Sequence, residues 1–336
     1  MSVELFLALR YNSSWLYSHM EVMSLSSSSY VAIVGGMNVD ISGTSDSKII
    51  LGDSNPGKVT LSLGGVGRNI AENLILLGKS CRMVTVLGDD LHAETIRADC
   101  RRIGLDLSAC ETIPGAKSST YLCINDINSD LMAAVADMSI CEMITPHFLK
   151  KHLDVLNGAE FVIVDANIPP ASAAFLADWC ESPLIADTVS IKKASRLSPC
   201  LWRLLAIKPN RPEAELLTGV PIRGTQGLDD AASELLNAGV RNVFISLGSL
   251  GVYYADQTHR GIQSCIPGSL VNTNGCGDSF LAAASLSLMS GMSIAEAALL
   301  GQASASICAE AESAVNPALN MRVLRKRAGL DSNLSS

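Results

Sequence analysis

The chain of 336 residues is 48% apolar and only 17% charged, a composition that supports a large buried core and excludes a disordered or fibrous protein. Twenty-five basic side chains against thirty-three acidic ones give a net charge of -8, which argues against a long nucleic acid as partner. The length fits one large α/β domain or two ordinary ones.

Residues 1–29 differ from the rest in their scattered aromatic residues and the serine run at 24–29. We expect an extension outside the fold, and its acidic residues do not fit an Arg-rich targeting peptide. The ten cysteines contain no Cys-x-x-Cys pair, which predicts reduced thiols and a cytoplasmic protein. A peroxisomal or mitochondrial location has no clear signal. No uncharged apolar run reaches the length of a membrane span, so we expect no membrane partner.

From residue 30 onward, short apolar runs alternate with amphipathic stretches. The runs begin at Tyr30, Met83, Phe161, Pro183, Leu204 and Asn242, and the helical patterns cover residues 69–77, 92–103, 228–238 and 294–310. Continuous apolar strands are typical of a parallel sheet that is covered by helices on both faces. The fold class is therefore predicted as α/β, a doubly wound, mainly parallel sheet sandwich.

Polar residues follow the predicted strands. They are Asn38, Asp40, Asp89, Asp90, Asp165, Asn167, Asp187, Asn210 and Glu213, with Gly248 and Gly251 after the last strand. Ligands bind outside the carboxyl ends of parallel strands, so these groups are expected to converge on one crevice. The alternative is that Asp and Asn merely cap helices and form turns, which accounts for Asp89 and Asp90.

Two regions interrupt the alternation of strand and helix, at residues about 40–63 and 117–137. Both contain short alternating segments, and residues 126–130 are typical of a hairpin turn. We expect these regions to form a small antiparallel β sheet that acts as a lid and pairs with a second subunit in a homodimer.

The first chemical motif is Gly64-Gly65-Val66-Gly67-Arg68-Asn69, which leads directly into a helix. Glycines here permit close backbone approach, and the helix N-terminus presents unpaired N–H groups to a ligand. A dinucleotide-binding loop would need a third glycine where this chain has Ile70, so that alternative fails.

The second motif runs from Asn272 to Asp278, with Gly275, Cys276 and Gly277 before a long uncharged helix. Successive backbone N–H groups at a helix N-terminus can form an anion hole for a transferring phosphoryl group. Asp278 is placed to accept a proton from an attacking hydroxyl. The alternative is that Asp278 only complements the helix dipole.

Together, GGVGRNIAENLILLG and NTNGCGD resemble the two signatures of the PfkB, or ribokinase-like, carbohydrate kinase family, in the right order and separation. The resemblance implies one kinase domain over residues 30–327, with the two lid segments inside it and a tail at 328–336. It implies ATP as co-substrate, with Mg²⁺ organised through water by Asn210 and Glu213.

The resemblance also implies roles for individual residues. Asp278 would be the catalytic base, and Gly275, Cys276 and Gly277 would form the anion hole. The expected substrate-binding residues are Asn38, Asp40, Gly64, Gly65, Arg68, Asn69, Ser119 and Asp165. The expected ATP-binding residues are Asn210, Ser246, Gly248, Gly251, Gly275 and Gly277.

Within the family, NVDISG, DSNPGK, SSTYL, KPNRPEAE and Arg68 are similar to members that act on free pseudouridine. This implies ATP-dependent phosphorylation of the nucleoside at its 5′-hydroxyl. Two alternatives stay open: another sugar or nucleoside kinase, for example for ribose or adenosine, and a nucleoside sensor without catalytic activity.

Two residues depart from the family pattern. Cys276 replaces the usual alanine but keeps a backbone N–H, so the hole is expected to survive. Asn272 replaces an aspartate and removes a charge near the site where many relatives bind a monovalent cation, which argues against potassium activation.

Overall fold

A computed structural model of the chain describes residues 29–128 and 130–330. Most of the predicted N-terminal extension, and residues 331–336 of the predicted tail, lie outside the described residues. Within the described part, none of the helices combines the length and apolar character needed to cross a bilayer. All ten cysteines are free.

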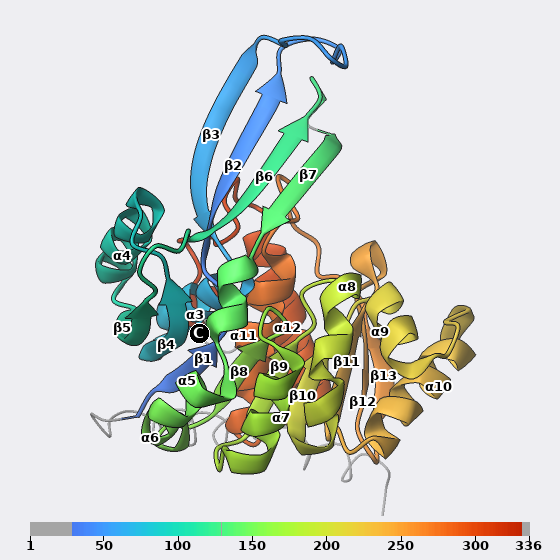
Figure 1. Cartoon of the computed structure of the whole chain (residues 1–336). Coiled ribbons are helices and arrows are strands. Elements are labelled where there is room, and N and C mark those ends of the chain that lie inside the picture. The colour runs from blue at the N-terminus through green and yellow to red at the C-terminus, as the bar shows by residue number, and fades with distance from the viewer. Residues whose placement is uncertain (1–28, 129, 331–336) are drawn as a thin grey trace, which may run out of the picture.

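The larger of two sheets has nine strands in the order β13-β12-β11-β10-β9-β8-β1-β4-β5 (Figure 1). The strands are β1 (Val31–Val34), β4 (Cys81–Leu87), β5 (Asp106–Thr112), β8 (Val162–Asp165), β9 (Leu184–Asp187), β10 (Leu204–Lys208), β11 (Asn242–Ser246), β12 (Val252–Ala255) and β13 (Arg260–Gln263). Pairing is parallel from β5 to β11, while β12 and β13 add an antiparallel hairpin at one edge. The predicted mainly parallel α/β fold is confirmed.

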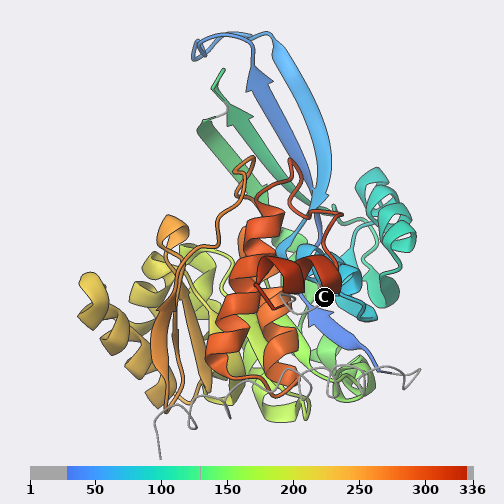
Figure 2. The same cartoon turned by 180° about the vertical axis from the view of Figure 1, so that it is seen from behind.

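Helices cover both faces of this sheet, as the apolar strands require. One face packs against α5 (Pro146–Lys151), α6 (Leu153–Asn157), α7 (Pro170–Trp179), η2 (Ser195–Arg203), α9 (Arg211–Thr218) and α10 (Gly224–Asn237). The other packs against α3 (Val66–Leu76), α4 (Leu91–Ile103), α11 (Cys276–Met289) and α12 (Ile294–Cys308), the last two prominent in Figure 2. Within β1, Val31 and Ile33 join one core, and Ala32 and Val34 join the other.

Four shorter helical elements lie between or after those named above, within residues 29–128 and 130–330. They are η1 (Ser139–Met143), α8 (Ile191–Ala194), η3 (Gly248–Leu250) and α13 (Met321–Arg327). The last of these packs on α12, beside the end of the predicted kinase domain.

The second sheet is the predicted lid, with strand order β3-β2-β6-β7. Its strands are β2 (Asn38–Ser45), β3 (Gly57–Gly64), β6 (Ser119–Asn125) and β7 (Leu131–Asp137). Two antiparallel hairpins, β2–β3 and β6–β7, meet through a parallel pairing of β2 with β6, a detail that the sequence did not reveal. The sheet projects from the carboxyl end of the large sheet (Figure 1).

The two faces of the lid differ in chemistry because side chains alternate along each strand. Ile41 lies opposite Leu61 and Leu122, and Leu122 lies opposite Val135, so one apolar row crosses all four strands. Asp40 points to the other face, opposite Ser62 and Tyr121.

Candidate active site

The two glycine motifs meet at Asp278. This residue lies in the first turn of α11, is 9% exposed, and accepts a hydrogen bond from Nδ2 of Asn69 at 2.9 Å. Asn69 lies on α3, 209 positions earlier in the chain. The fold thus brings the predicted base and a predicted substrate ligand into direct contact.

Burial raises the pKa of Asp278 to about 7, and the neighbouring carboxylate of Asp187 adds to the rise. Asn69 and the ammonium of Lys208 oppose it. A carboxyl group with a pKa near neutrality is suited to accept a proton from a hydroxyl group.

Lys208 and Asp187 form a buried ion pair at the floor of the site, with Nζ and Oδ2 3.2 Å apart. Burial alone would lower the pKa of Lys208, but Asp187, Asp278 and Glu213 together raise it. A Cβ atom on Gly277 would lie 3.1 Å from Nζ, so the ammonium lies against the second motif. Sequence reasoning placed Asp187 in the crevice but assigned no role to Lys208, although the lysine stands in the quoted KPN segment.

The Gly64-Gly65 turn positions the start of α3. Gly65 is the residue before the helix and has φ 102°, and a Cβ there would lie 2.6 Å from the carbonyl oxygen of Gly36. Only glycine fits this close approach without strain. Gly64 pairs with Asn38 in the lid, so one turn joins the lid to the catalytic helix α3.

The second motif also depends on a glycine. Gly275 has φ 79°, and a Cβ would lie 1.8 Å from the carbonyl oxygen of Ala314. The N–H of Cys276 donates to Thr273 O at 3.3 Å. The sequence predicts this N–H as a donor to the bound anion, whereas in the structure it is engaged within the loop. Gly277 and Asp278 follow in the first helical turn, where N–H groups have no intrahelical acceptor. The donors available for an anion are thus those of Gly277 and Asp278.

A cavity of about 580 Å³ adjoins the second motif. Its lining includes five of the six predicted ATP-binding residues, Asn210, Ser246, Gly248, Gly251 and Gly277, together with Cys276 and Lys208. The sixth, Gly275, is not part of the lining. Phe280 contributes apolar surface, and Gln302 and Ser306 contribute polar groups from α12. The structure therefore brings five of the six predicted ATP-binding residues to one cavity, and their role in binding ATP stays a prediction.

Asn210 and Glu213 form a capping box at the start of α9. Glu213 accepts hydrogen bonds from the backbone and side-chain nitrogens of Asn210, at 2.9 Å each, and from Oγ1 of Thr188 at 2.6 Å. Among the described residues, no three His, Cys, Asp or Glu side chains are grouped to hold a metal. Both carboxylate oxygens of Glu213 are thus engaged within the protein. The predicted role of Asn210 and Glu213 toward Mg²⁺ stays a prediction.

The predicted substrate residues Asn38 and Asp40 contact each other, with Asn38 Nδ2 2.5 Å from Asp40 Oδ1. Burial raises the pKa of Asp40. Ser119 is buried beside Asn38 in the lid register. These three residues lie at the base of the lid.

Two predicted substrate residues are engaged within the protein. Asp165 is 0% exposed, and its Oδ2 accepts hydrogen bonds from the N–H groups of Gly36 and Gly67 at 2.9 and 3.1 Å. Burial raises its pKa to about 6. Arg68 is buried and forms ion pairs with Glu72 and Asp99. Both side chains hold the α3 region in place, and their predicted role in substrate binding stays a prediction.

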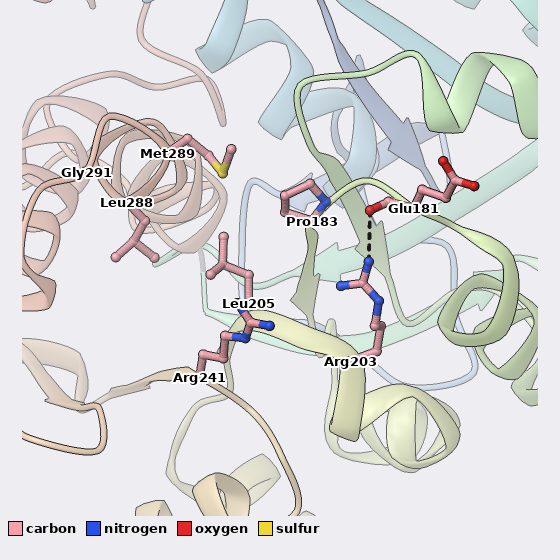
Figure 3. A pocket seen from close by; sticks show the side chains of 8 residues that line it. All are labelled: Glu181, Pro183, Arg203, Leu205, Arg241, Leu288, Met289 and Gly291. Carbon is pink, nitrogen blue, oxygen red and sulfur yellow. Dashed lines mark hydrogen bonds between the residues drawn. The ribbon is translucent and has the colours of Figure 1, made fainter. Parts of the chain in front are cut away.

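A second cavity, of about 360 Å³, lies outside this site (Figure 3). Pro183 and Leu205 place it at the amino ends of β9 and β10, where Arg203 donates to the carbonyl oxygen of Glu181 at 2.9 Å. None of the predicted site residues lines it.

Comparison with known proteins agrees with this geometry. Residues 28–321 match the model of the pfkB family carbohydrate kinases. Pseudouridine kinase of Escherichia coli is 32% identical over 87% of this chain and 94% of its own length. The sugar kinase YeiI of the same organism is 33% identical over 88% of this chain and 82% of its own length.

The fold is also similar to a solved structure of Arabidopsis thaliana ribokinase complexed with ribose and ATP, with a TM-score of 0.81. The two chains are 22% identical, and the match covers 90% of this chain and 99% of the ribokinase chain. The chain belongs to the pfkB carbohydrate kinase family and is a phosphotransferase that acts on a hydroxyl group.

Proposed function

We propose that the protein phosphorylates the 5′-hydroxyl of free pseudouridine with ATP. The observation that carries the proposal is the Asn69–Asp278 contact beside the nucleotide cavity, because it joins a substrate-side helix to a base of suitable pKa. The likeness to a pseudouridine kinase supports the choice of nucleoside.

In the proposed reaction, the 5′-oxygen attacks the γ-phosphorus of ATP as its proton passes to a carboxylate oxygen of Asp278. The bond between the γ-phosphorus and the oxygen that bridges to the β-phosphate breaks, and ADP leaves with that electron pair. Asn69 holds Asp278 by its hydrogen bond. Such a reaction depends mainly on positioning and charge stabilisation.

Backbone N–H groups and one buried ammonium would stabilise the charge that develops on the transferred group. Gly277 and Asp278 supply N–H groups at the positive end of α11, and Lys208 lies against Gly277. Lys208 is itself fixed by Asp187. We therefore assign Lys208 to the phosphate side of the site.

ATP would occupy the cavity lined by Asn210, Ser246, Gly248 and Gly251. A divalent ion bound with the phosphates would shield their charge, and Asn210 and Glu213 would orient it through water. A potassium requirement is not proposed, because both polar atoms of the Asn272 side chain are engaged. Its Nδ2 donates to Glu312 O at 2.7 Å, and its Oδ1 accepts from Asn274 N at 3.0 Å.

The lid would hold the nucleoside. Asn38 and Asp40 present polar groups for ribose hydroxyls from the base of β2, and Ser119 lies beside them. Because Asp40 is on the polar face, closure of the lid would bring it over the substrate and exclude water. Asp165 and Arg68 would act by fixing the α3 region.

The apolar face of the lid supports a homodimer. Leu61 is 67% exposed, Val135 66% and Leu122 42%, and together with Ile41 they form the row that crosses all four strands. An exposed apolar patch of this kind marks an association surface. A second copy would cover it by pairing the same row with itself.

The test is product analysis with purified protein, ATP and Mg²⁺. Pseudouridine, uridine, adenosine and ribose are offered separately, and ³¹P NMR locates the phosphate. We expect pseudouridine 5′-phosphate as the best product. Faster turnover of a free sugar would favour the sugar-kinase alternative, which the likeness to YeiI keeps relevant. Binding of nucleoside without any product would favour the sensor.

A further inference from the structure

A buried amide lines the nucleotide cavity without a partner. Gln302 lies in the middle of α12, is 7% exposed, and is part of the cavity wall. Within residues 29–128 and 130–330, its side chain forms no hydrogen bond. Buried amides are normally paired, because an unpaired N–H or C=O group costs free energy. An unpaired amide at a cavity wall is therefore placed to bind a ligand.

The cavity has one charged end. Among the described residues that line it, Lys208 is the only one with a charged side chain, and it lies against Gly277 at the start of α11. Phosphate groups belong at that end. The cavity side chains on α12, and those before and after the second motif, are uncharged and include Ile266, Leu270, Phe280, Ala305, Ser306 and Ala309. This region suits an uncharged part of the nucleotide.

Gln302 lies away from the anion hole along α12, the helix that packs beside α11 (Figure 2). Directly after α12, the carbonyl oxygen of Ala309 accepts hydrogen bonds from the N–H groups of Val271 and Asn272, at 2.8 and 3.2 Å. That end of α12 therefore adjoins the second motif. Gln302 comes seven residues earlier, about 10 Å along the helix axis. This distance leaves room for a ribose between phosphates at the hole and a base at Gln302.

The part of the cavity beside Gln302 has two close walls. The ring of Phe280 packs so tightly on α12 that a Cβ at Gly301 would lie 2.6 Å from it. The loop before the second motif also passes close to α12, since a Cβ at Gly268 would lie 2.8 Å from Oγ of Ser306. Apolar walls with a few polar groups are typical of a site for an aromatic ligand.

The amide chemistry points to one kind of base. A glutamine side chain offers an acceptor, Oε1, beside a donor, Nε2. Adenine presents the complementary pair, because its amino group N6 donates and the neighbouring ring nitrogen N7 accepts. Guanine has the acceptor O6 in place of the amino group, so on that edge Oε1 would face another acceptor.

We propose that Gln302 selects the phosphate donor by pairing with the amino group and N7 of adenine. This inference rests on the proposed function, in which ATP occupies the cavity, and adds the protein group that recognises its base. Gln302 is a specificity-determining residue that does not touch the reacting atoms. Its loss is therefore expected to raise the KM for ATP more than it lowers kcat.

The test removes the hydrogen-bonding group from the protein, from the nucleotide, or from both. Gln302→Met removes both polar atoms at similar size, and purine riboside triphosphate is ATP without its amino group. Calorimetric titration with Mg²⁺ and without nucleoside gives the Kd of each nucleotide. The original chain should bind ATP about three- to tenfold more tightly than purine riboside triphosphate, and more tightly than GTP by about tenfold or more. Gln302→Met should bind ATP and purine riboside triphosphate with equal Kd.

Gln226→Met is the matched control. Gln226 is an exposed residue of α10 and does not line the cavity, so this variant should keep the nucleotide preference of the original chain. If Gln302→Met does not fold, as judged by its melting temperature, Gln302→Leu gives the same comparison. The nucleotide series on the original chain tests the pairing without any variant.

Equal Kd values of the original chain for ATP and purine riboside triphosphate would overturn the inference. So would an unchanged preference in Gln302→Met, or an equal loss of affinity for ATP, GTP and purine riboside triphosphate, which would place the amide at the ribose or the phosphates. The expected preference without any phosphorylated nucleoside would count against the proposed function alone. Absence of ATP binding would overturn both.

Discussion

The two sheets of this protein are built from strands of opposite character. All four residues of β1, β8 and β9 are buried, whereas all seven residues of β7 are exposed. The large sheet is fixed by two apolar cores, while the lid is one layer thick and is held to the rest mainly at its base. Parts of a protein with few buried contacts open at low cost.

This difference assigns separate tasks to the two regions. Asp278 and Lys208 lie at the fixed sheet and helix ends, where a reacting atom needs constant geometry. Asn38 and Asp40 lie on the lid, for which we propose closure over the substrate. We therefore expect changes at the large sheet to lower kcat and changes in the lid to alter KM or assembly.

The largest effect is expected from Asp278→Asn. The amide cannot accept the proton from the 5′-hydroxyl, so kcat should fall by about 10²- to 10⁴-fold while nucleoside binding persists. Steady-state kinetics and calorimetric titration measure the two quantities. Asp154→Asn is the matched control, since Asp154 is an exposed acidic residue in the first turn of α6. A variant at Asp278 with the original kcat would show that this carboxylate is not the base.

The next effect concerns the lid. Asp40→Ala removes a proposed ribose ligand, and loss of a hydrogen bond to a charged group should raise KM about tenfold or more. Thr44→Ala is a control on the same face of β2, nearer the tip of the lid. If kcat falls and KM stays constant, Asp40 belongs to the catalytic region, and the division of tasks is wrong.

A third change tests the apolar face of the lid. Leu61→Glu together with Leu122→Glu places charges in the apolar row and should convert a dimer into monomers, as measured by light scattering during gel filtration. Leu216→Glu, on α9 and 49% exposed, should leave the mass unchanged. A monomeric original chain, or a double variant that stays dimeric, would contradict the proposed interface.

The pH dependence follows from Asp278. Its pKa is raised from 3.8 to about 7, so the carboxyl group is protonated and inactive as a base at lower pH. We expect kcat/KM to fall about tenfold per pH unit below this value and to level off above it. Rates in buffers of equal ionic strength measure the profile. A flat profile from pH 5 to 8 would show that this titration does not limit the reaction.

The smallest effect is expected from potassium. Because the side chain of Asn272 is occupied on both sides, replacing K⁺ with tetramethylammonium at constant ionic strength should leave kcat/KM unchanged. A strong dependence of kcat/KM on K⁺ would contradict this prediction and would indicate a cation site that does not include the Asn272 side chain.

The sequence predicted the buried strands and both glycine motifs because their patterns are local. It missed β5, whose half-exposed residues at a sheet edge mix polar and apolar types, and it did not predict the edge hairpin of β12 and β13. The alternation that defines the lid was visible, but the parallel pairing of β2 with β6 joins segments far apart in sequence.

Contacts between distant segments were equally hard to predict from the sequence in the candidate active site. The Lys208–Asp187 pair forms only because β9 and β10 are neighbours, and sequence spacing does not reveal this. Asp165 was correctly placed at the end of β8, but its hydrogen bonds to Gly36 and Gly67 depend on three separate segments. Residue type and strand position therefore predicted where a group lies better than what it contacts.

The central claim is that this site phosphorylates pseudouridine in preference to uridine, which lacks the additional ring N–H of the C-nucleoside. The most direct measurement offers both nucleosides together at equal concentration with limiting ATP and compares the two monophosphates by chromatography. Their initial ratio equals the ratio of kcat/KM values. We predict an excess of pseudouridine 5′-phosphate of about tenfold or more. Equal amounts of the two products, or an excess of uridine monophosphate, would contradict the claim.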